Sequence, residues 1–137
     1  MLVIFAAMGW GNRFVGKRAK VRPRQPAKGM NKTEARYAAK LKADLLAGRI
    51  AQFEFEAVTL KLSDALRFIP DFMVIDADMH ITFYDTKAGK KDGTVLVEDD
   101  ALAKLKMAAE RFPHFGFVMT WEDKTTGLWK EREFRHL

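Results

Sequence analysis

The spacing of apolar residues predicts two helices. Residues 31–47 and 98–112 carry apolar side chains three or four positions apart, which places them on one face of a helix. Asn31 is a favourable N-cap for the first helix, and Gly48 is a favourable stop for it. Pro113 ends the second helix.

The segments between and after the helices alternate between apolar and polar residues, a pattern typical of half-buried strands. The alternation changes phase near Ala57, which predicts a bulge or bend there. A short turn around Asp78 joins two of the strands into a hairpin. The predicted strands cover residues 52–62, 67–76, 80–87, 115–121 and 128–134. This order of elements predicts an α/β (α+β) fold, with a central mixed sheet flanked by helices.

Charge is distributed unevenly along the 137 residues. The chain has 24 basic and 18 acidic residues, and residues 1–30 hold seven of the basic residues and no acid. Because this segment also contains prolines and glycines, we expect residues 1–29 to form a flexible basic arm that neutralises phosphates. Residues 30–137 would form a single folded domain. A solubilising tail or an idle terminus would give the same charge pattern.

The composition excludes several kinds of site. Without cysteine the chain can form neither disulfides nor thiolate metal sites, and its three scattered histidines lack metal-ligand spacing. No stretch is long and apolar enough for a membrane span. The apolar residues 1–8 lack the preceding positive charge of a signal peptide. We therefore expect a cytoplasmic protein with no membrane partner.

The hairpin around Asp78 places two acids and a lysine together. If the turn is centred on Asp78, Asp71 and Asp85 are directly opposed, with Cβ atoms about 5 Å apart. Lys87 lies two positions beyond Asp85 and projects from the same face. A turn shifted by one residue would separate the two acids.

Opposed carboxylates repel each other, and a divalent cation between them removes that conflict. Carboxylate oxygens suit Mg²⁺, which can bind a substrate phosphate at the same time and activate a water molecule. Lys87 would orient that water or stabilise developing charge. In a plainer alternative, Pro70-Asp71 only begins a strand, while Asp85 and Lys87 form an ion pair on a solvated edge.

Glu34 is compatible with two roles. With Asn31 it can complete a capping box, in which its carboxylate bonds back to the amide of the N-cap. It also lies one turn before Ala38 on the apolar stripe of the first helix, where a buried acid is costly without a partner. A metal centre would supply that partner.

Pro70-Asp71 and the later Asp85-Thr86-Lys87 match the Pro-Asp and (Asp/Glu)-x-Lys motif of the PD-(D/E)XK nuclease superfamily. The chain resembles a small phage-borne group of that superfamily over roughly residues 30–120, similar to Holliday-junction resolvases. Asp85 stands where glutamate is more usual in the motif. The resemblance implies a restriction-endonuclease-like αβββαβ core.

The resemblance also implies a reaction and roles for individual residues. Glu34, Asp71 and Asp85 would bind Mg²⁺ or Mn²⁺, the backbone carbonyl of Thr86 would be a further ligand, and Lys87 would assist the attacking water. The implied activity is structure-specific hydrolysis of phosphodiester bonds in branched DNA. A homodimer is implied too, because symmetric cutting of a four-way junction needs two active sites. The phosphate-binding surface would combine Lys90, Lys91, Lys104, Arg18, Lys20, Arg22 and Arg24.

Two other functions share these residues. A less selective nuclease or nickase for DNA processing or degradation would use the same catalytic set and differ only in substrate preference. A non-catalytic DNA-binding accessory protein would keep the fold without the reaction. The intact set of Glu34, Asp71, Asp85 and Lys87 favours an enzyme.

Overall fold

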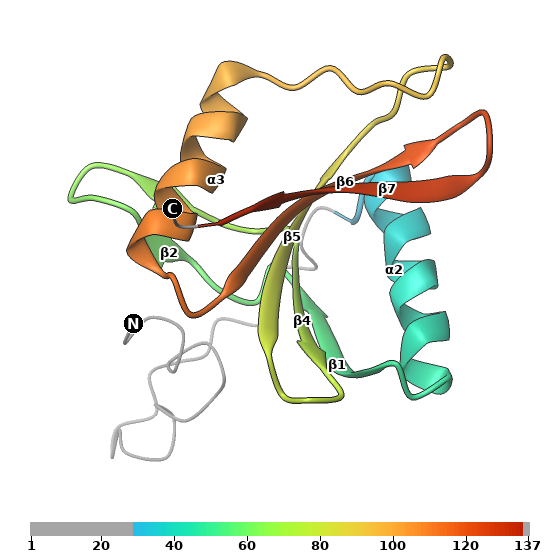
Figure 1. Cartoon of the computed structure of the whole chain (residues 1–137), viewed down its shortest axis with the longest axis horizontal. Helices are drawn as coiled ribbons and strands as arrows, with labels where there is room; N and C mark the ends of the chain where they lie inside the picture. Colours follow the sequence, from blue (N-terminus) through green and yellow to red (C-terminus); the bar gives the residue numbers. More distant parts are fainter. Residues whose placement is uncertain (1–28, 136–137) are drawn as a thin grey trace.

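The computed structural model describes residues 29–135 as three layers, with a sheet between two helices (Figure 1). Helix α2 (Lys32–Leu46) lies on one face of the sheet, and α3 (Asp99–Arg111) lies on the other. The strands of this sheet are β1 (Ile50–Phe55), β4 (Phe72–Asp76), β5 (Ile81–Lys87), β6 (Gly116–Asp123) and β7 (Leu128–Phe134). The predicted mixed sheet flanked by helices is therefore confirmed. Residues 1–28 of the predicted arm lie outside the described residues.

The sheet is mixed because α3 carries the chain from one strand to a parallel neighbour. The strand order is β1-β4-β5-β6-β7. β5 and β6 run parallel, and every other neighbouring pair is antiparallel. Parallel neighbours need a long crossover connection, and α3 with its flanking loops supplies it. β5 is thus a central strand with a neighbour on each side.

The predicted hairpin register is confirmed. The facing residues of β4 and β5 are Phe72 and Tyr84, Met73 and Phe83, Val74 and Thr82, and Ile75 and Ile81. The Asp76 carboxylate accepts hydrogen bonds from the backbone N–H groups of Asp78 (2.8 Å) and His80 (3.0 Å). These local bonds hold the turn and with it the register, because a turn of different length would shift every facing pair.

Two of the predicted strands are wrong in length. The segment 52–62 is interrupted at Glu56, which has a φ of 46°, and the segment 67–76 is interrupted before β4 begins at Phe72. Short parts of these two segments, β2 (Leu60–Lys61) and β3 (Arg67–Phe68), form a separate antiparallel ribbon. Pro70 explains the second interruption, because proline has no N–H to donate to a ladder.

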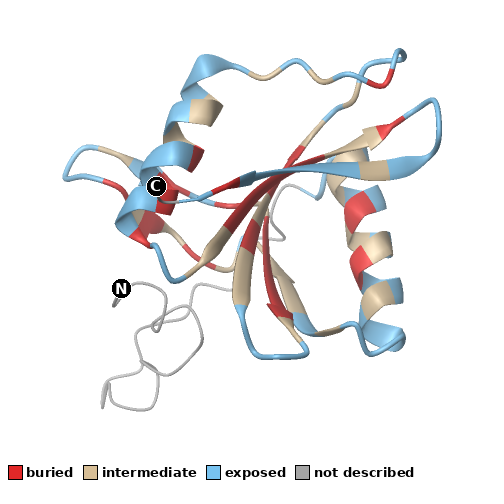
Figure 2. Cartoon of the chain, in the orientation of Figure 1, coloured by how far each residue is buried: buried red, intermediate tan, exposed pale blue. Residues whose placement is uncertain are grey.

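The expected phase change near Ala57 marks the place where the chain passes from one face of the sheet to the other. Phe53 and Phe55 pack in the cluster beneath α2, whereas Val58 and Leu60 belong to the cluster beneath α3. Buried residues are concentrated in the central strands of the sheet (Figure 2), and their side chains belong to two clusters, one beneath each helix. Residues 72–75 are all buried, as expected for a strand covered on both sides.

No helix within residues 29–135 is both long and apolar enough to cross a membrane.

Candidate functional site

Asp71 and Asp85 meet at the end of the central hairpin. Asp85 lies on β5 and is 8% exposed, and Asp71 directly precedes β4 in a half-buried position. Continuing the register of the hairpin brings the two residues opposite each other. Burial, and after it the negative charge of Asp85, raises the pKa of Asp71 to about 6. The two carboxyl groups therefore interact, as the sequence predicted.

Thr86 holds the Asp71 carboxylate in place. The backbone N–H and the side-chain hydroxyl of Thr86 both donate to Asp71 Oδ2, at 2.7 and 2.8 Å. These two bonds lower the pKa of Asp71 and so oppose the effect of burial, because they favour the charged carboxylate. The backbone N–H of Glu56 donates to the carbonyl of Asp71 at 2.8 Å. Main chain and side chain of Asp71 are thus both anchored.

Lys87 lies beside the two acids. Its Nζ is 2.9 Å from Asp85 Oδ2, which agrees with the expected projection of Lys87 and Asp85 from one face of the strand. The plainer alternative predicted the same ion pair, but on a solvated edge. The position observed is different, because the Asp85 side chain is only 10% exposed and β5 lies in the interior of the sheet.

Glu34 forms the predicted capping box at the start of α2. The backbone N–H of Asn31 donates to Glu34 Oε2 at 2.9 Å, and the backbone N–H of Glu34 donates to Asn31 Oδ1 at 2.8 Å. The negative charge of Glu34 also raises the pKa of Asp71, although it is the weakest of the effects that do so. Within residues 29–135, no three acidic or histidine side chains converge as a metal-binding group.

The structure therefore brings Asp71, Asp85 and Lys87 together, while the Glu34 carboxylate stays with its helix cap. The Thr86 backbone joins the group through its N–H bond to Asp71.

A hollow of about 390 Å³ opens beside Asp85 and Lys87. Its walls come from β3 with the residues that follow it and from the first turns of α3. Lys104, predicted to border the site, is part of the lining, where its Nζ lies 3.2 Å from Asp100 Oδ2. The other lining residues are Arg67, Phe68, Ile69, Glu98 and Ala101. The hollow thus gives a ligand access to one side of the acid pair.

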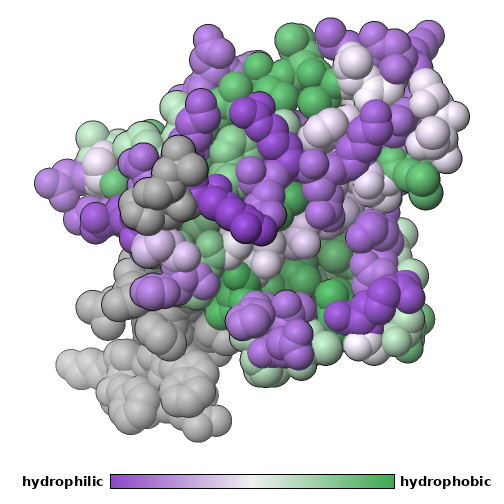
Figure 3. Space-filling model, in the orientation of Figure 1, coloured by the Kyte–Doolittle hydropathy of each residue, from purple (hydrophilic) through white to green (hydrophobic). Residues whose placement is uncertain are grey.

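Lys90 and Lys91, also predicted to bind DNA, are exposed on the loop after β5. This loop is held to the sheet, since the Trp121 indole N–H donates to the carbonyl of Gly93 at 3.4 Å. Hydrophilic side chains are frequent at this corner of the molecule (Figure 3). Neither lysine lines the hollow. The four arginines and lysines expected to bind DNA from the arm (Arg18, Lys20, Arg22 and Arg24) lie outside the described residues.

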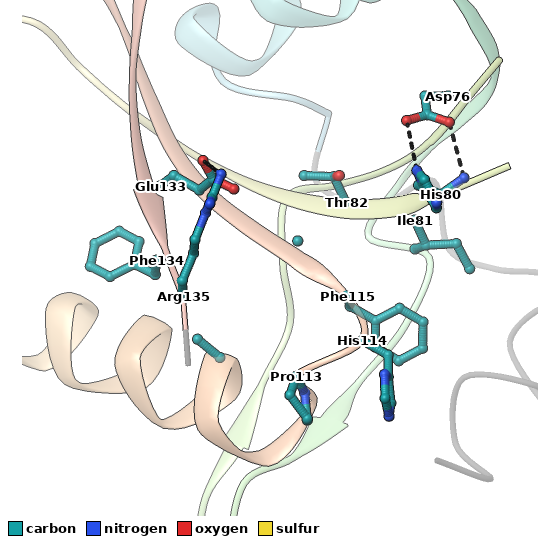
Figure 4. Close-up of a pocket in the computed structure, with 12 residues that line it drawn as sticks. Asp76, His80, Ile81, Thr82, Pro113, His114, Phe115, Glu133, Phe134 and Arg135 are labelled. Carbon is teal, nitrogen blue, oxygen red and sulfur yellow. Dashed lines mark hydrogen bonds and ion pairs between the residues drawn. The ribbon is translucent and has the colours of Figure 1, made fainter. Parts of the chain in front are cut away.

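A larger hollow, of about 500 Å³, lies at the other end of β5 (Figure 4). Its acids have basic partners close by in the chain. Asp76 Oδ2 lies 3.7 Å from His80 Nδ1, and Glu133 Oε2 lies 2.9 Å from Arg135 Nη2. Sequence reasoning did not find this hollow, because its lining comes from three stretches that are far apart in the chain, 76–82, 109–116 and 133–135.

Arg67 and the acids at the start of α3 were also missed as parts of the candidate site. The only signal available in the sequence was that Arg67 lies three positions before Pro70-Asp71.

No protein-family model matches the chain, and neither a curated protein nor a solved structure matches it.

Proposed function

We propose that the protein is a metal-dependent DNA endonuclease of the PD-(D/E)XK type, which hydrolyses phosphodiester bonds in branched DNA. The observation that carries the proposal is the pair of buried Asp85 and half-buried Asp71, opposed at the end of the hairpin, with Lys87 beside Asp85 and a hollow next to Asp85 and Lys87. With the separate β2–β3 ribbon and the final strand β7 left out, the element order α2-β1-β4-β5-α3-β6 is compatible with the αβββαβ core that the motif implies. A homodimer follows from the same proposal, because paired cuts in a four-way junction need two active sites.

The acid pair fits a small divalent cation. A cation between Asp71 and Asp85 would relieve the repulsion that raises the pKa of Asp71. Mg²⁺ is commonly held by one or two carboxylates and water, so that a substrate phosphate can complete its ligand shell. Two side chains are therefore enough, with the Thr86 carbonyl as a further ligand, and Glu34 would join them only by leaving its cap. When bound, Mg²⁺ or Mn²⁺ supplies an activated water and neutralises charge on the phosphate.

Each residue of the candidate site then has a distinct task. Thr86 keeps the carboxylate of Asp71 oriented through two hydrogen bonds. Lys87 neutralises Asp85 in the absence of metal. Once Asp85 serves as a ligand, the Lys87 ammonium is available to orient the attacking water or to stabilise charge on the phosphate. Water adds to phosphorus, one bond from phosphorus to a sugar oxygen breaks, and that oxygen takes up a proton.

Cleavage of three end-labelled DNAs tests the proposal: a four-way junction, a linear duplex and a single strand. Each is incubated with Mg²⁺, with Mn²⁺ and with chelator, using wild type and Asp85→Asn. We expect metal-dependent, paired nicks in the junction that disappear in the variant. Equal cutting of all three DNAs would keep the nuclease and overturn the preference for branched DNA.

A non-catalytic DNA-binding protein is the second candidate. The observation in its favour is that Asp85 is paired with Lys87 and Glu34 with its helix cap, so neither acid requires a metal. Calorimetric titration with Mg²⁺ and Mn²⁺ separates the two functions. The nuclease is expected to release or absorb heat that is lost in Asp71→Asn, whereas the accessory protein gives no such heat.

A further inference from the structure

Arg67 differs from the other basic residues of the hollow beside Asp85. Lys87 is paired with Asp85 and Lys104 with Asp100. Among residues 29–135, no carboxylate forms an ion pair with Arg67, although this residue lines the same hollow. Within the part of the chain that the structure describes, the positive charge of Arg67 is therefore not engaged in an ion pair.

The contacts that Arg67 does make fix one end of its guanidinium group. Nη1 donates to the backbone carbonyl of Ser63 at 2.7 Å, with longer contacts of 3.5 Å to the carbonyls of Asp64 and Leu66. All of these bonds use Nη1, and all of them go to the turn between β2 and β3. A guanidinium held by one nitrogen keeps donors on Nη2 and Nε for a planar, two-oxygen ligand.

The ribbon that carries Arg67 is attached to the body of the protein. The Arg111 Nε–H of α3 donates to the carbonyl of Lys61 at 2.9 Å. Leu60, Leu62 and Phe68 are buried in the core beneath α3. Because its backbone is anchored on both sides, Arg67 offers its donors from a defined position rather than from a loose tail.

Given the proposed nuclease function, we infer that Arg67 binds a phosphate of the DNA backbone in the hollow and positions the strand against Asp71, Asp85 and Lys87. Arginine suits this task because its fork of N–H donors matches two non-bridging phosphate oxygens, which a lysine ammonium does not. Arg67 acts here as a positioning residue, since the reacting atoms lie with the acid pair.

The test measures DNA binding without chemistry. Binding of fluorescent four-way junction and linear duplex DNA is followed by anisotropy in chelator, over a series of salt concentrations. The proteins are wild type, Arg67→Ala, Arg67→Lys and Arg132→Ala. Arg132 is an exposed arginine on β7 whose guanidinium lies over the Phe134 ring, so its variant removes the same charge from another strand. Thermal melting establishes that each variant is folded.

We expect Arg67→Ala to weaken binding about tenfold, as for the loss of a charge-assisted hydrogen-bonded pair. It should also reduce the slope of the log–log salt dependence by about one. Arg67→Lys should keep the slope, because the charge remains, and recover only part of the affinity. Arg132→Ala should bind like wild type. Equal affinity and slope for Arg67→Ala and Arg132→Ala would overturn the inference.

Cleavage with Mg²⁺ separates this inference from the proposed function. If wild type cuts DNA and Arg67→Ala binds and cuts equally well, the phosphate site is overturned and the nuclease stands. If wild type does not cut but its DNA binding depends on Arg67, the nuclease is overturned and the phosphate site stands. Absence of DNA binding by wild type would overturn both.

Discussion

A hollow lies at each end of β5, and the acidic side chains at the two ends have different partners. At the start of the strand, Asp76 accepts hydrogen bonds from the amides of its own turn, and Glu133 pairs with Arg135 two positions away. At its end, Asp85 is opposed to Asp71, an acid that directly precedes the neighbouring strand of the same hairpin. The first arrangement satisfies each acid locally, while the second sets two acids against each other.

This difference separates a hollow from a site. The hollow at the start of β5 is the larger of the two, yet its acids are matched by neighbours that the local chain provides. Burial and mutual repulsion at the other end raise the pKa of Asp71 to about 6. The charged form of Asp71 therefore lowers the stability of the folded protein. Such perturbed groups in an open cleft are typical of functional sites. We therefore expect the opposed acid pair, rather than the larger hollow, to mark the functional site.

Removal of one acid from each end should give the largest contrast. Asp85→Asn and Asp71→Asn are each expected to lower metal-dependent DNA cleavage more than about a hundredfold, because a direct metal ligand is lost. Asp76→Asn, at the other hollow, should change the rate less than about twofold. Single-turnover cleavage of the four-way junction measures all three. A similar loss in Asp76→Asn would mean that the comparison of the two ends is wrong.

Glu34→Gln tests whether the helix-cap acid serves the site. Glutamine can replace glutamate in a capping box, so the variant should keep its stability within about 0.5 kcal/mol. We expect cleavage to fall about tenfold, in the range found for groups that support a metal site. Urea denaturation and cleavage are measured on the same preparation. Unchanged cleavage would assign Glu34 to capping alone.

Asp71→Asn should stabilise the metal-free protein at neutral pH. The pKa of Asp71 rises from 3.8 to about 6 on folding. Between these values the folded protein binds more protons at this residue than the unfolded chain does. Stability therefore falls as the pH rises through this window and stays lower above it. At pH 8 in chelator we expect the variant to be more stable by about 1–2 kcal/mol, with no difference near pH 3.

Urea denaturation at pH 3, 5 and 8 measures this effect, with Asp76→Asn as the control for the loss of one acidic charge. Mg²⁺ should raise the stability of wild type at pH 8 and not that of Asp71→Asn. Parallel pH profiles for wild type and Asp71→Asn would contradict the prediction.

Thr86→Val should give the smallest effect. The variant has nearly the same shape and removes the hydroxyl that donates to Asp71 Oδ2, while the backbone N–H bond remains. Because these bonds lower the pKa of Asp71, the acidic limb of the pH–rate profile should move to higher pH. Thr94→Val, which removes an exposed hydroxyl bond to Asp92, should leave the profile in place. A profile unmoved in Thr86→Val would show that the hydroxyl does not tune Asp71.

The elements that could be predicted from the sequence are those controlled by neighbouring residues. Asn31 and Glu34 form the cap of α2 as expected, and the turn after Asp76 sets the register that opposes Asp71 to Asp85. The strand lengths around Glu56 and Pro70 could not be predicted in the same way. An alternating run continues as a strand only where a neighbouring strand is available to pair with it, and the chain there turns away from the sheet.

The candidate site also combines features that the local sequence sets with features that only tertiary contacts set. The sequence by itself determined that Asp71, Asp85 and Lys87 share one face of a hairpin, because turn length and the two-residue period of strands are local properties. Only the tertiary structure decided that Arg67 and the first turn of α3 close a hollow over that face. It also decided that Asp85 is buried in a central strand. These features depend on contacts between segments distant in the chain, and no local pattern encodes which of those segments will meet.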